Sequence, residues 1–312
     1  MCKLKSPTEF KTVVEMILYF SDEKKCLQYL EQSVWGGSIR CLHCGTDKVY
    51  RYKNGIMFKC SACQEKFTAK MGTIFESSKL PMIKWFTAMW LIGNHKKGVS
   101  SVQLAKDIGV TQKTAWFMLQ RIRKSMQQEH KGKLDGVVMS DETFVGGKNR
   151  NRHKDKKAII PYGRNYEDKT PVIGLLQENG EIRCFITKNT QNECLHPVVD
   201  GNVAEGAILV TDEWRGYKSI QTKVIHEVVQ HNQKRYVSKN GFSTNAVEGF
   251  WSHLKRAIFG IYHNVTKKHL QRYVDEIVFK FNTRLMKETE RLNFMMQKVR
   301  CRLKYKHLIQ CQ

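Results

Sequence analysis

The stretch GVVMSDETFV, residues 136–145, is an apolar run with a polar intrusion at Asp141. Its pattern predicts a buried strand. A second stretch, AILVTDEW at residues 207–214, repeats the arrangement and ends its apolar run in Asp212. A carboxylate within or at the end of a hydrophobic strand is costly unless it is paired or binds a cation. The two strands therefore predict a shared site for the two aspartates.

A third carboxylate, Glu248, lies in the predicted helix FSTNAVEGFWSHLKRAIFG, residues 242–260. Phe250, Leu254 and Ile258 fall at i, i+4 and i+8, the spacing of one buried helix face. Glu248 is the only carboxylate between Glu227 and Asp275, a span that holds eight Lys or Arg residues. A helix this basic does not need a lone glutamate for solubility, so Glu248 is a candidate third member of the site.

Asp141, Asp212 and Glu248 are the predicted catalytic residues and the predicted ligands of two Mg²⁺ or Mn²⁺ ions. Two ions held by carboxylates activate a water or a 3′-hydroxyl and stabilise the leaving oxygen of a phosphodiester. Two alternatives remain open from the residues alone. Asp141 could be a turn residue, and Glu248 could pair with Lys255 or Arg256 in a purely structural role.

Four of the ten cysteines, Cys41, Cys44, Cys60 and Cys63, form two C-x-x-C pairs fifteen residues apart. Two such knuckles joined by a hairpin, which Asn54-Gly55 would turn, form a closed four-sulfur site for structural Zn²⁺. The other cysteines are scattered, which indicates a reducing compartment and a cytoplasmic protein. The face of this ribbon is a candidate DNA contact through four basic residues: Lys48, Arg51, Lys53 and Lys59.

Residues 98–126 fit a helix-turn-helix, with Gly109 at the turn and Thr111 as the cap of the second helix. The exposed start of that helix would face the major groove of DNA with Gln112, Lys113 and Thr114. An ordinary helical hairpin is the alternative. The basic run Arg121, Arg123 and Lys124 favours DNA binding over it.

The formal net charge of +24 and the pI of about 9.6 indicate a polyanionic partner. No run of eighteen apolar residues is present, so no membrane span is expected. The N-terminal segment lacks the features of a signal peptide. The basic block KNRNRHKDKK, residues 148–157, is either a solvated loop or a phosphate clamp, and the tail KVRCRLKYKHL, residues 298–308, would add phosphate contacts.

Strands are also expected at 171–177, 182–187 and 224–229, with a helix at 190–200 and helices after 242. This order, with thirty-five residues between Asp212 and Glu248, resembles the RNase-H-like core of DDE transposases and retroviral integrases. The motifs DETFVGGK, VTDEWRGY and TNAVEGFWSHLK, after a four-cysteine ribbon and QLAKDIGVTQKTAW, resemble the zinc-ribbon insertion-sequence transposases related to the Merlin elements. The resemblance implies an α/β protein with an RNase-H-like mixed sheet, preceded by a zinc ribbon and a helix-turn-helix and followed by C-terminal helices.

The resemblance also implies the activity: binding of double-stranded DNA at terminal inverted repeats, then cleavage and strand transfer into target DNA by a homo-oligomer. Lys255 and Arg256 would contact DNA near the cleaved end. Two other functions remain open, a non-catalytic or domesticated DNA-binding regulator and a nuclease acting on RNA–DNA hybrids. The expected domains are a helical segment (residues 1–34), the ribbon (35–78), the helix-turn-helix region (79–130), the catalytic domain (131–285) and a basic helical tail (286–312).

Overall fold

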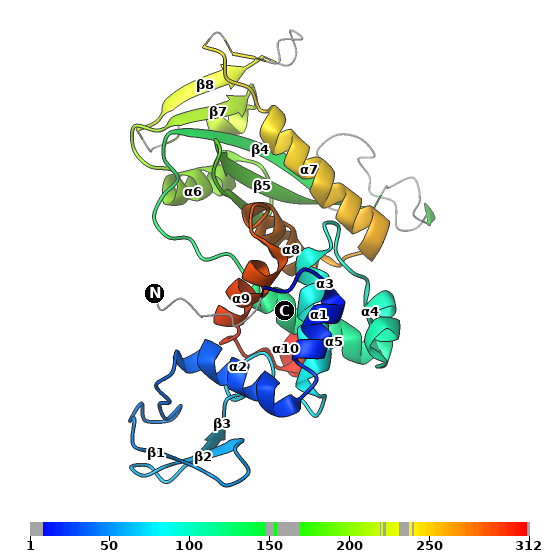
Figure 1. Cartoon of the computed structure of the whole chain (residues 1–312). Helices are drawn as coiled ribbons and strands as arrows, with labels where there is room; N and C mark the ends of the chain where they lie inside the picture. The colour runs from blue at the N-terminus through cyan, green and yellow to red at the C-terminus, as the bar shows by residue number, and fades with distance from the viewer. Residues whose placement is uncertain are drawn as a thin grey trace. The chain divides into compact units, whose positions relative to one another are not determined.

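The computed structural model describes residues 9–147, 153–154, 169–218, 220, 223–230, 237–238 and 240–310. The basic block at 148–157 falls outside this set, apart from its residues 153 and 154. The chain forms two compact units (Figure 1). The first unit combines residues 1–127 with residues 285–312, and the second comprises residues 128–284.

The first unit begins with two helices and a small sheet. Helices α1 (Val13–Tyr19) and α2 (Glu23–Trp35) start at the side-chain caps Thr12 and Asp22. The ribbon follows as an antiparallel sheet of β1 (Val49–Arg51), β2 (Met57–Cys60) and β3 (Lys66–Thr68). The hairpin turns where expected, because Asn54 accepts two backbone N–H bonds and Gly55 adopts a φ of +70°.

Three further helices follow in the first unit: α3 (Met82–Asn94), α4 (Ser101–Ile108) and α5 (Gln112–Ser125). The C-terminal helices α9 (Glu288–Gln297) and α10 (Tyr305–Ile309) return to this unit. The amide of Ile74 bonds to the carbonyl of Val299 at 2.9 Å, and Thr289 bonds to the backbone of Phe10 at 2.8 Å. Both ends of the chain therefore build one core.

Three basic residues of the C-terminal segment are engaged within the first unit. Arg302 forms an ion pair with Glu76 at 2.8 Å, Lys298 donates to the carbonyl of Gln127, and Arg300 donates to the carbonyl of Val34. These contacts fix the segment to the protein. Lys304 and Lys306 of the same segment are exposed.

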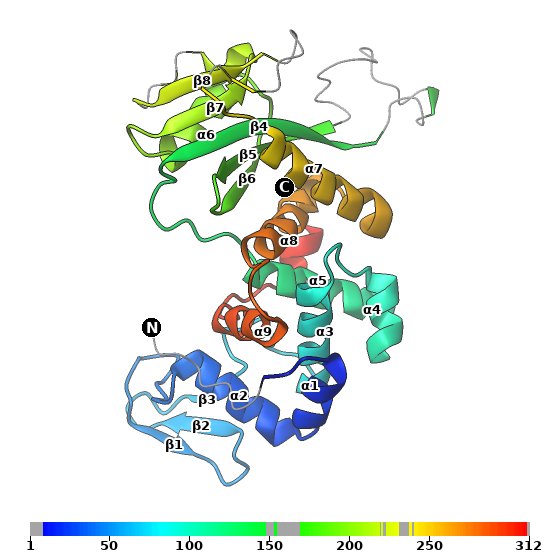
Figure 2. The same cartoon turned by 45° about the horizontal axis from the view of Figure 1, so that its top comes forward.

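The second unit is a mixed five-stranded sheet in the order β6-β5-β4-β7-β8 (Figure 2). The strands are β4 (Val137–Gly146), β5 (Lys169–Gln177), β6 (Ile182–Ile186), β7 (Ile208–Asp212) and β8 (Ile225–Val229). Strands β4, β5 and β6 pair antiparallel, whereas β4, β7 and β8 pair parallel. This is the mixed α/β core that the sequence predicts.

Helices cover both faces of this sheet. Helices α7 (Asn245–Ala257) and α8 (Leu270–Asn282) bury their apolar faces on one side, where Val247, Phe250 and Trp251 are buried. Helix α6 (Asn192–Asn202) and Tyr217 belong to the core on the other side. Alternate residues of β4 supply the two cores, with Met139 in the first and Val138 in the second. Within the described residues, every helix is too short or too polar to span a membrane.

Helix α8 carries a buried ion pair between Glu276 and Lys280, whose side chains are 0% and 8% exposed. The hydroxyl of Tyr262 donates to the same carboxylate at 2.6 Å. Replacing Lys280 with methionine would remove the cation of this pair from the buried Glu276. We expect this change to lower the free energy of unfolding by about 3 kcal/mol or more. Urea denaturation measures the loss, and adding Glu276→Gln to the same chain should recover part of it.

Candidate active site and metal centre

Strands β4 and β7 bring Asp141 and Asp212 side by side. The two strands pair in parallel through Val137↔Ile208, Val138↔Leu209 and Met139↔Val210. Asp141 and Asp212 stand two residues beyond the last of these pairs, so the same register makes them neighbours. Because side chains alternate along a strand, both aspartates lie on the face of Met139 and Val210. That face is the one covered by helix α7.

Glu248 approaches the aspartates from the first turn of α7. The helix packs through its buried face, and Glu248 lies on its exposed side. The pKa of Asp141 is raised to about 6, mainly by burial and in smaller part by the negative charges of Asp212 and Glu248. Asp212 and Glu248 are therefore each close enough to Asp141 to interact with it electrostatically.

Each of the three carboxylates accepts a hydrogen bond at one oxygen. Asp141 Oδ2 accepts from Trp251 Nε1 at 2.9 Å, and Asp212 Oδ1 accepts from the amide of Trp214 at 2.9 Å. Glu248 Oε1 accepts from Thr244 Oγ1 at 3.1 Å. Such bonds fix the orientation of a carboxylate before it binds anything else.

Trp251 and Gly174 are parts of this site that sequence reasoning missed. Trp251 of α7 is buried in the core, and its indole N–H also donates to Asp141. The ring lies over Gly174, which is the β5 partner of Asp141 in the sheet. A Cβ on Gly174 would meet the Trp251 ring at 2.6 Å. The glycine in the middle of an apolar strand was the signal, since glycine there often marks a close approach.

We expect Trp251→Phe to weaken divalent-cation binding by roughly 10–100-fold, because it removes the donor that orients Asp141 while keeping most of the ring. Mn²⁺ titration followed by electron paramagnetic resonance measures this on the protein without DNA. Trp85→Phe is a matched control in the first unit, since Trp85 Nε1 donates to Ser78 Oγ at 3.0 Å. Equal Mn²⁺ affinity in Trp251→Phe and wild type would rule out the orienting role of Trp251.

The three carboxylates are candidate ligands for hard cations. Carboxylate oxygens are the ligands that Mg²⁺ and Mn²⁺ prefer. A bound cation would stabilise the ionised form of Asp141, which burial and the neighbouring carboxylates disfavour. Among the described residues, only the four cysteines bring three or more ligand atoms within 4.8 Å of one another. The carboxylates are therefore more widely spaced than the sulfurs.

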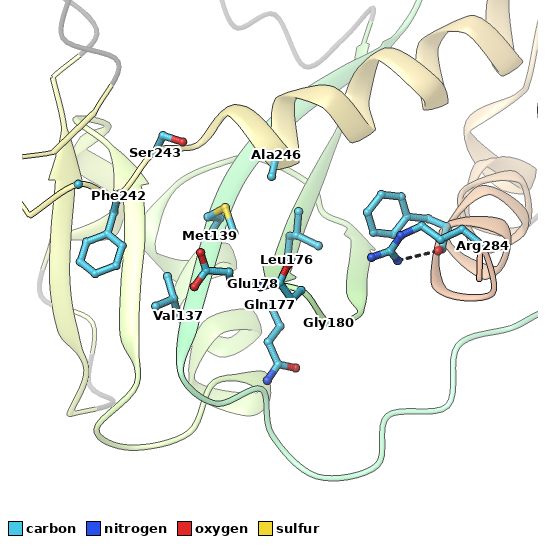
Figure 3. A pocket seen from close by; sticks show the side chains of 13 residues that line it. Val137, Met139, Leu176, Gln177, Glu178, Gly180, Phe242, Ser243, Ala246 and Arg284 are labelled. Atoms are coloured by element: carbon cyan, nitrogen blue, oxygen red, sulfur yellow. Dashed lines mark hydrogen bonds between the residues drawn. The ribbon is translucent and has the colours of Figure 1, made fainter. Parts of the chain in front are cut away.

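A pocket of about 330 Å³ opens on the same face of the second unit (Figure 3). Its lining includes Met139 and Ala246, which stand two residues before Asp141 and Glu248 respectively. The turn after β5 supplies its polar wall, and Arg284 lies at its edge, where it donates to the carbonyl of Phe281 at 2.9 Å. The pocket therefore reaches α7 at Ala246, while Asp141, Asp212 and Glu248 are not among the described residues that line it.

The four cysteines form a compact site in the first unit. Cys41 Sγ lies 3.6 Å from Cys63 Sγ, and Cys44 Sγ lies 3.5 Å from Cys60 Sγ. Backbone amides of the two knuckles point at Cys41 and Cys60, at 3.4 and 3.3 Å. Four converging thiolates leave no open position for a substrate, so the site supports a structural Zn²⁺.

The helix-turn-helix has the predicted local structure. Ser100 caps α4, Gly109 takes the turn at a φ of +60°, and Thr111 caps α5. Gln112 and Lys113 are exposed at the start of α5, and Thr114 is partly buried. Gln112 also donates to Ser101 Oγ at 2.8 Å, which ties the two helices together.

Two of the basic residues that favoured DNA binding are buried rather than exposed to solvent. Arg121 is buried and donates to the carbonyls of Leu303, Ile74 and Glu76, while Arg123 is 1% exposed. Arg51 of the ribbon is likewise directed to Glu31, at 2.6 Å. A basic run on a helix winds around it, so sequence alone did not show which members face the core.

The comparisons with known proteins agree with this architecture. Residues 133–282 match an ISXO2-like transposase domain, and residues 21–66 match a transposase zinc-ribbon domain. The chain belongs to the IS1595 transposase family. A protein of the transposable element ISH50 of Halobacterium salinarum is 26% identical over 267 residues, which cover 82% of this chain and 89% of that protein.

Among solved structures, this IS1595-family transposase matches a chain from the simian T-cell lymphotropic virus intasome bound to a PP2A regulatory subunit. The TM-score is 0.29 and the identity 11%, over 56% of this chain and 63% of that chain. The predicted fold class, the zinc ribbon and the transposase assignment are confirmed by the family matches and the cysteine cluster.

Proposed function

We propose that this transposase binds the ends of its element and catalyses DNA cleavage and strand transfer, with Asp141, Asp212 and Glu248 as its catalytic residues. The observation that supports the proposal is that Asp141 on β4 lies close enough to both Asp212 on β7 and Glu248 on α7 to interact with their charges. Three acids gathered beside a polyanionic substrate would weaken DNA binding unless cations offset their charge.

The three carboxylates would hold two Mg²⁺ or Mn²⁺ ions, which when bound supply Lewis acidity to the attacking and leaving oxygens of the phosphodiester. The protein's own part is to fix the ligands. Trp251 orients Asp141, and the backbone of Trp214 orients Asp212. Lys255 and Arg256 are exposed in the last turn of α7, where they would hold phosphates of the DNA.

Recognition of double-stranded element ends is proposed for the first unit. Gln112, Lys113 and Thr114 stand at the start of α5, the position from which a recognition helix contacts base edges. The zinc ribbon gives this unit a second DNA-binding element. A homo-oligomer is proposed because two ends must be joined in one reaction.

The test is strand transfer of a pre-cleaved element end into a target plasmid. With Mg²⁺ or Mn²⁺ we expect covalently joined products, and with EDTA none. The element end is taken from the DNA that flanks the gene, where terminal inverted repeats are expected. Specific binding to these ends without joining in either metal would favour the second candidate, a DNA-binding regulator. Cleavage of an RNA–DNA hybrid without joining would favour a nuclease.

A further inference from the structure

One face of the ribbon sheet packs into the core of the ribbon, and the other face is turned toward solvent. Phe58 and Phe67 are buried on the first face, where they pack with Trp35. Arg51 belongs to this face too, because it pairs with Phe58 in the sheet and binds Glu31. The side chains of the intervening positions point the other way.

The second face carries a row of tyrosine and lysine. Tyr50 pairs with Lys59, and Lys59 pairs with Lys66, so the three side chains lie next to one another across the three strands. Tyr52 follows on the same face at the end of β1, with the Lys66 Nζ 5.9 Å from its ring centre. We call these four residues, Tyr50, Tyr52, Lys59 and Lys66, the outer face of the ribbon.

The outer face is unusual for a surface without a partner. Tyr50 is 67% exposed, which leaves most of a large ring in water. Lys59 and Lys66 are directly opposite each other, and like charges in that position destabilise a sheet. The three strands contain no aspartate or glutamate that would neutralise them. A polyanion on this face would convert the repulsion between the lysines into attraction.

We propose that the outer face of the ribbon binds a DNA strand, with Lys59 and Lys66 at its phosphates and Tyr50 and Tyr52 against its sugars or unpaired bases. The inference rests on the proposed function in one respect, that the protein acts on DNA. The proposal extends that function because it assigns the DNA contact to one face of the ribbon. It also removes Arg51, which binds Glu31, from the expected DNA contacts. Lysine and tyrosine side by side form the combination that follows a nucleic-acid backbone and supports its bases.

The salt dependence of DNA binding tests the lysines. Full-length protein is titrated against labelled duplex DNA by fluorescence anisotropy at several salt concentrations. For Lys59→Gln with Lys66→Gln, we expect weaker binding and a slope of log affinity against log salt that is smaller by roughly 2, about 0.9 for each lost phosphate contact. The control is Lys24→Gln with Lys25→Gln, which removes the same charge from exposed positions on α2.

Zinc content provides the check on folding, since both double variants should retain one ion per chain. An unchanged slope in the outer-face variant, or the same change in the control, would overturn the proposal. The result is independent of catalysis. If wild-type protein binds DNA but joins no ends, the proposed activity fails while the outer-face prediction is still decided by the slopes.

Tyrosine variants distinguish the two contacts that the rings can make. Tyr50→Ala is expected to lower affinity roughly tenfold for a duplex with a single-stranded end if the ring stacks on a base. An equal loss with a flush duplex would instead place the ring against the sugar-phosphate backbone. Wild-type affinity for both DNAs would exclude Tyr50 from the contact.

Discussion

Glu248→Gln is expected to lower strand transfer by roughly 10³-fold while leaving the protein folded. A carboxylate that holds catalytic cations contributes several kcal/mol to the transition state, and each 1.4 kcal/mol is about a factor of ten in rate. Glutamine preserves the size of the side chain and removes its charge. Because Glu248 is exposed, the change should alter the melting temperature little.

Glu205→Gln is the matched control, since Glu205 is an exposed glutamate in the same unit, before β7. It should join DNA at the wild-type rate. Binding to element ends should be unchanged or tighter in Glu248→Gln, because a negative charge near the DNA has been removed. Wild-type joining by Glu248→Gln would show that the third catalytic residue is wrongly assigned.

Cys60→Ser is expected to unfold the ribbon and to leave the second unit intact. Cys60 is fully buried between the two knuckles, and its sulfur accepts backbone N–H bonds from Ala62 and Cys63. Structural zinc contributes about 10–16 kcal/mol to the folding of small zinc-binding peptides, so a missing ligand removes most of what holds this sheet. The remaining core, mainly Phe58 and Phe67, is small.

Limited proteolysis with mass spectrometry measures this effect. New cleavage sites are expected within residues 36–70, and the five-stranded sheet should remain resistant. Zinc content should fall from one ion per chain to near zero. Cys194→Ser is the control, because Cys194 is partly exposed in α6 and far from the ribbon in the sequence. Retention of zinc and resistance by Cys60→Ser would contradict a four-sulfur structural site.

The strands and the main helices could be predicted because their signals are local. The apolar run before Asp212 ends where β7 ends, and Phe250 and Leu254 mark the buried face of α7. The turn at Gly109 and the hairpin at Asn54 could be predicted for the same reason, because each depends on residues close in the sequence. The four-cysteine spacing likewise specifies its own geometry.

The partners of polar side chains could not be predicted, because they depend on long-range packing. The hydrogen bond from Trp251 to Asp141 joins residues 110 positions apart. The Trp251 ring fits there because Gly174 beneath it has no side chain. Arg121 reaches the carbonyl of Leu303 across 182 positions. Composition shows that such a residue is basic, but only the fold shows whether its charge is directed to solvent or to the core.

The most direct test of the central claim is anomalous diffraction from crystals of the protein soaked in Mn²⁺. If Asp141, Asp212 and Glu248 form one metal centre, the map should contain manganese peaks between these three carboxylates, and Glu248→Gln should weaken or remove at least one of them. Manganese bound elsewhere, with no peak between the carboxylates, would contradict the account.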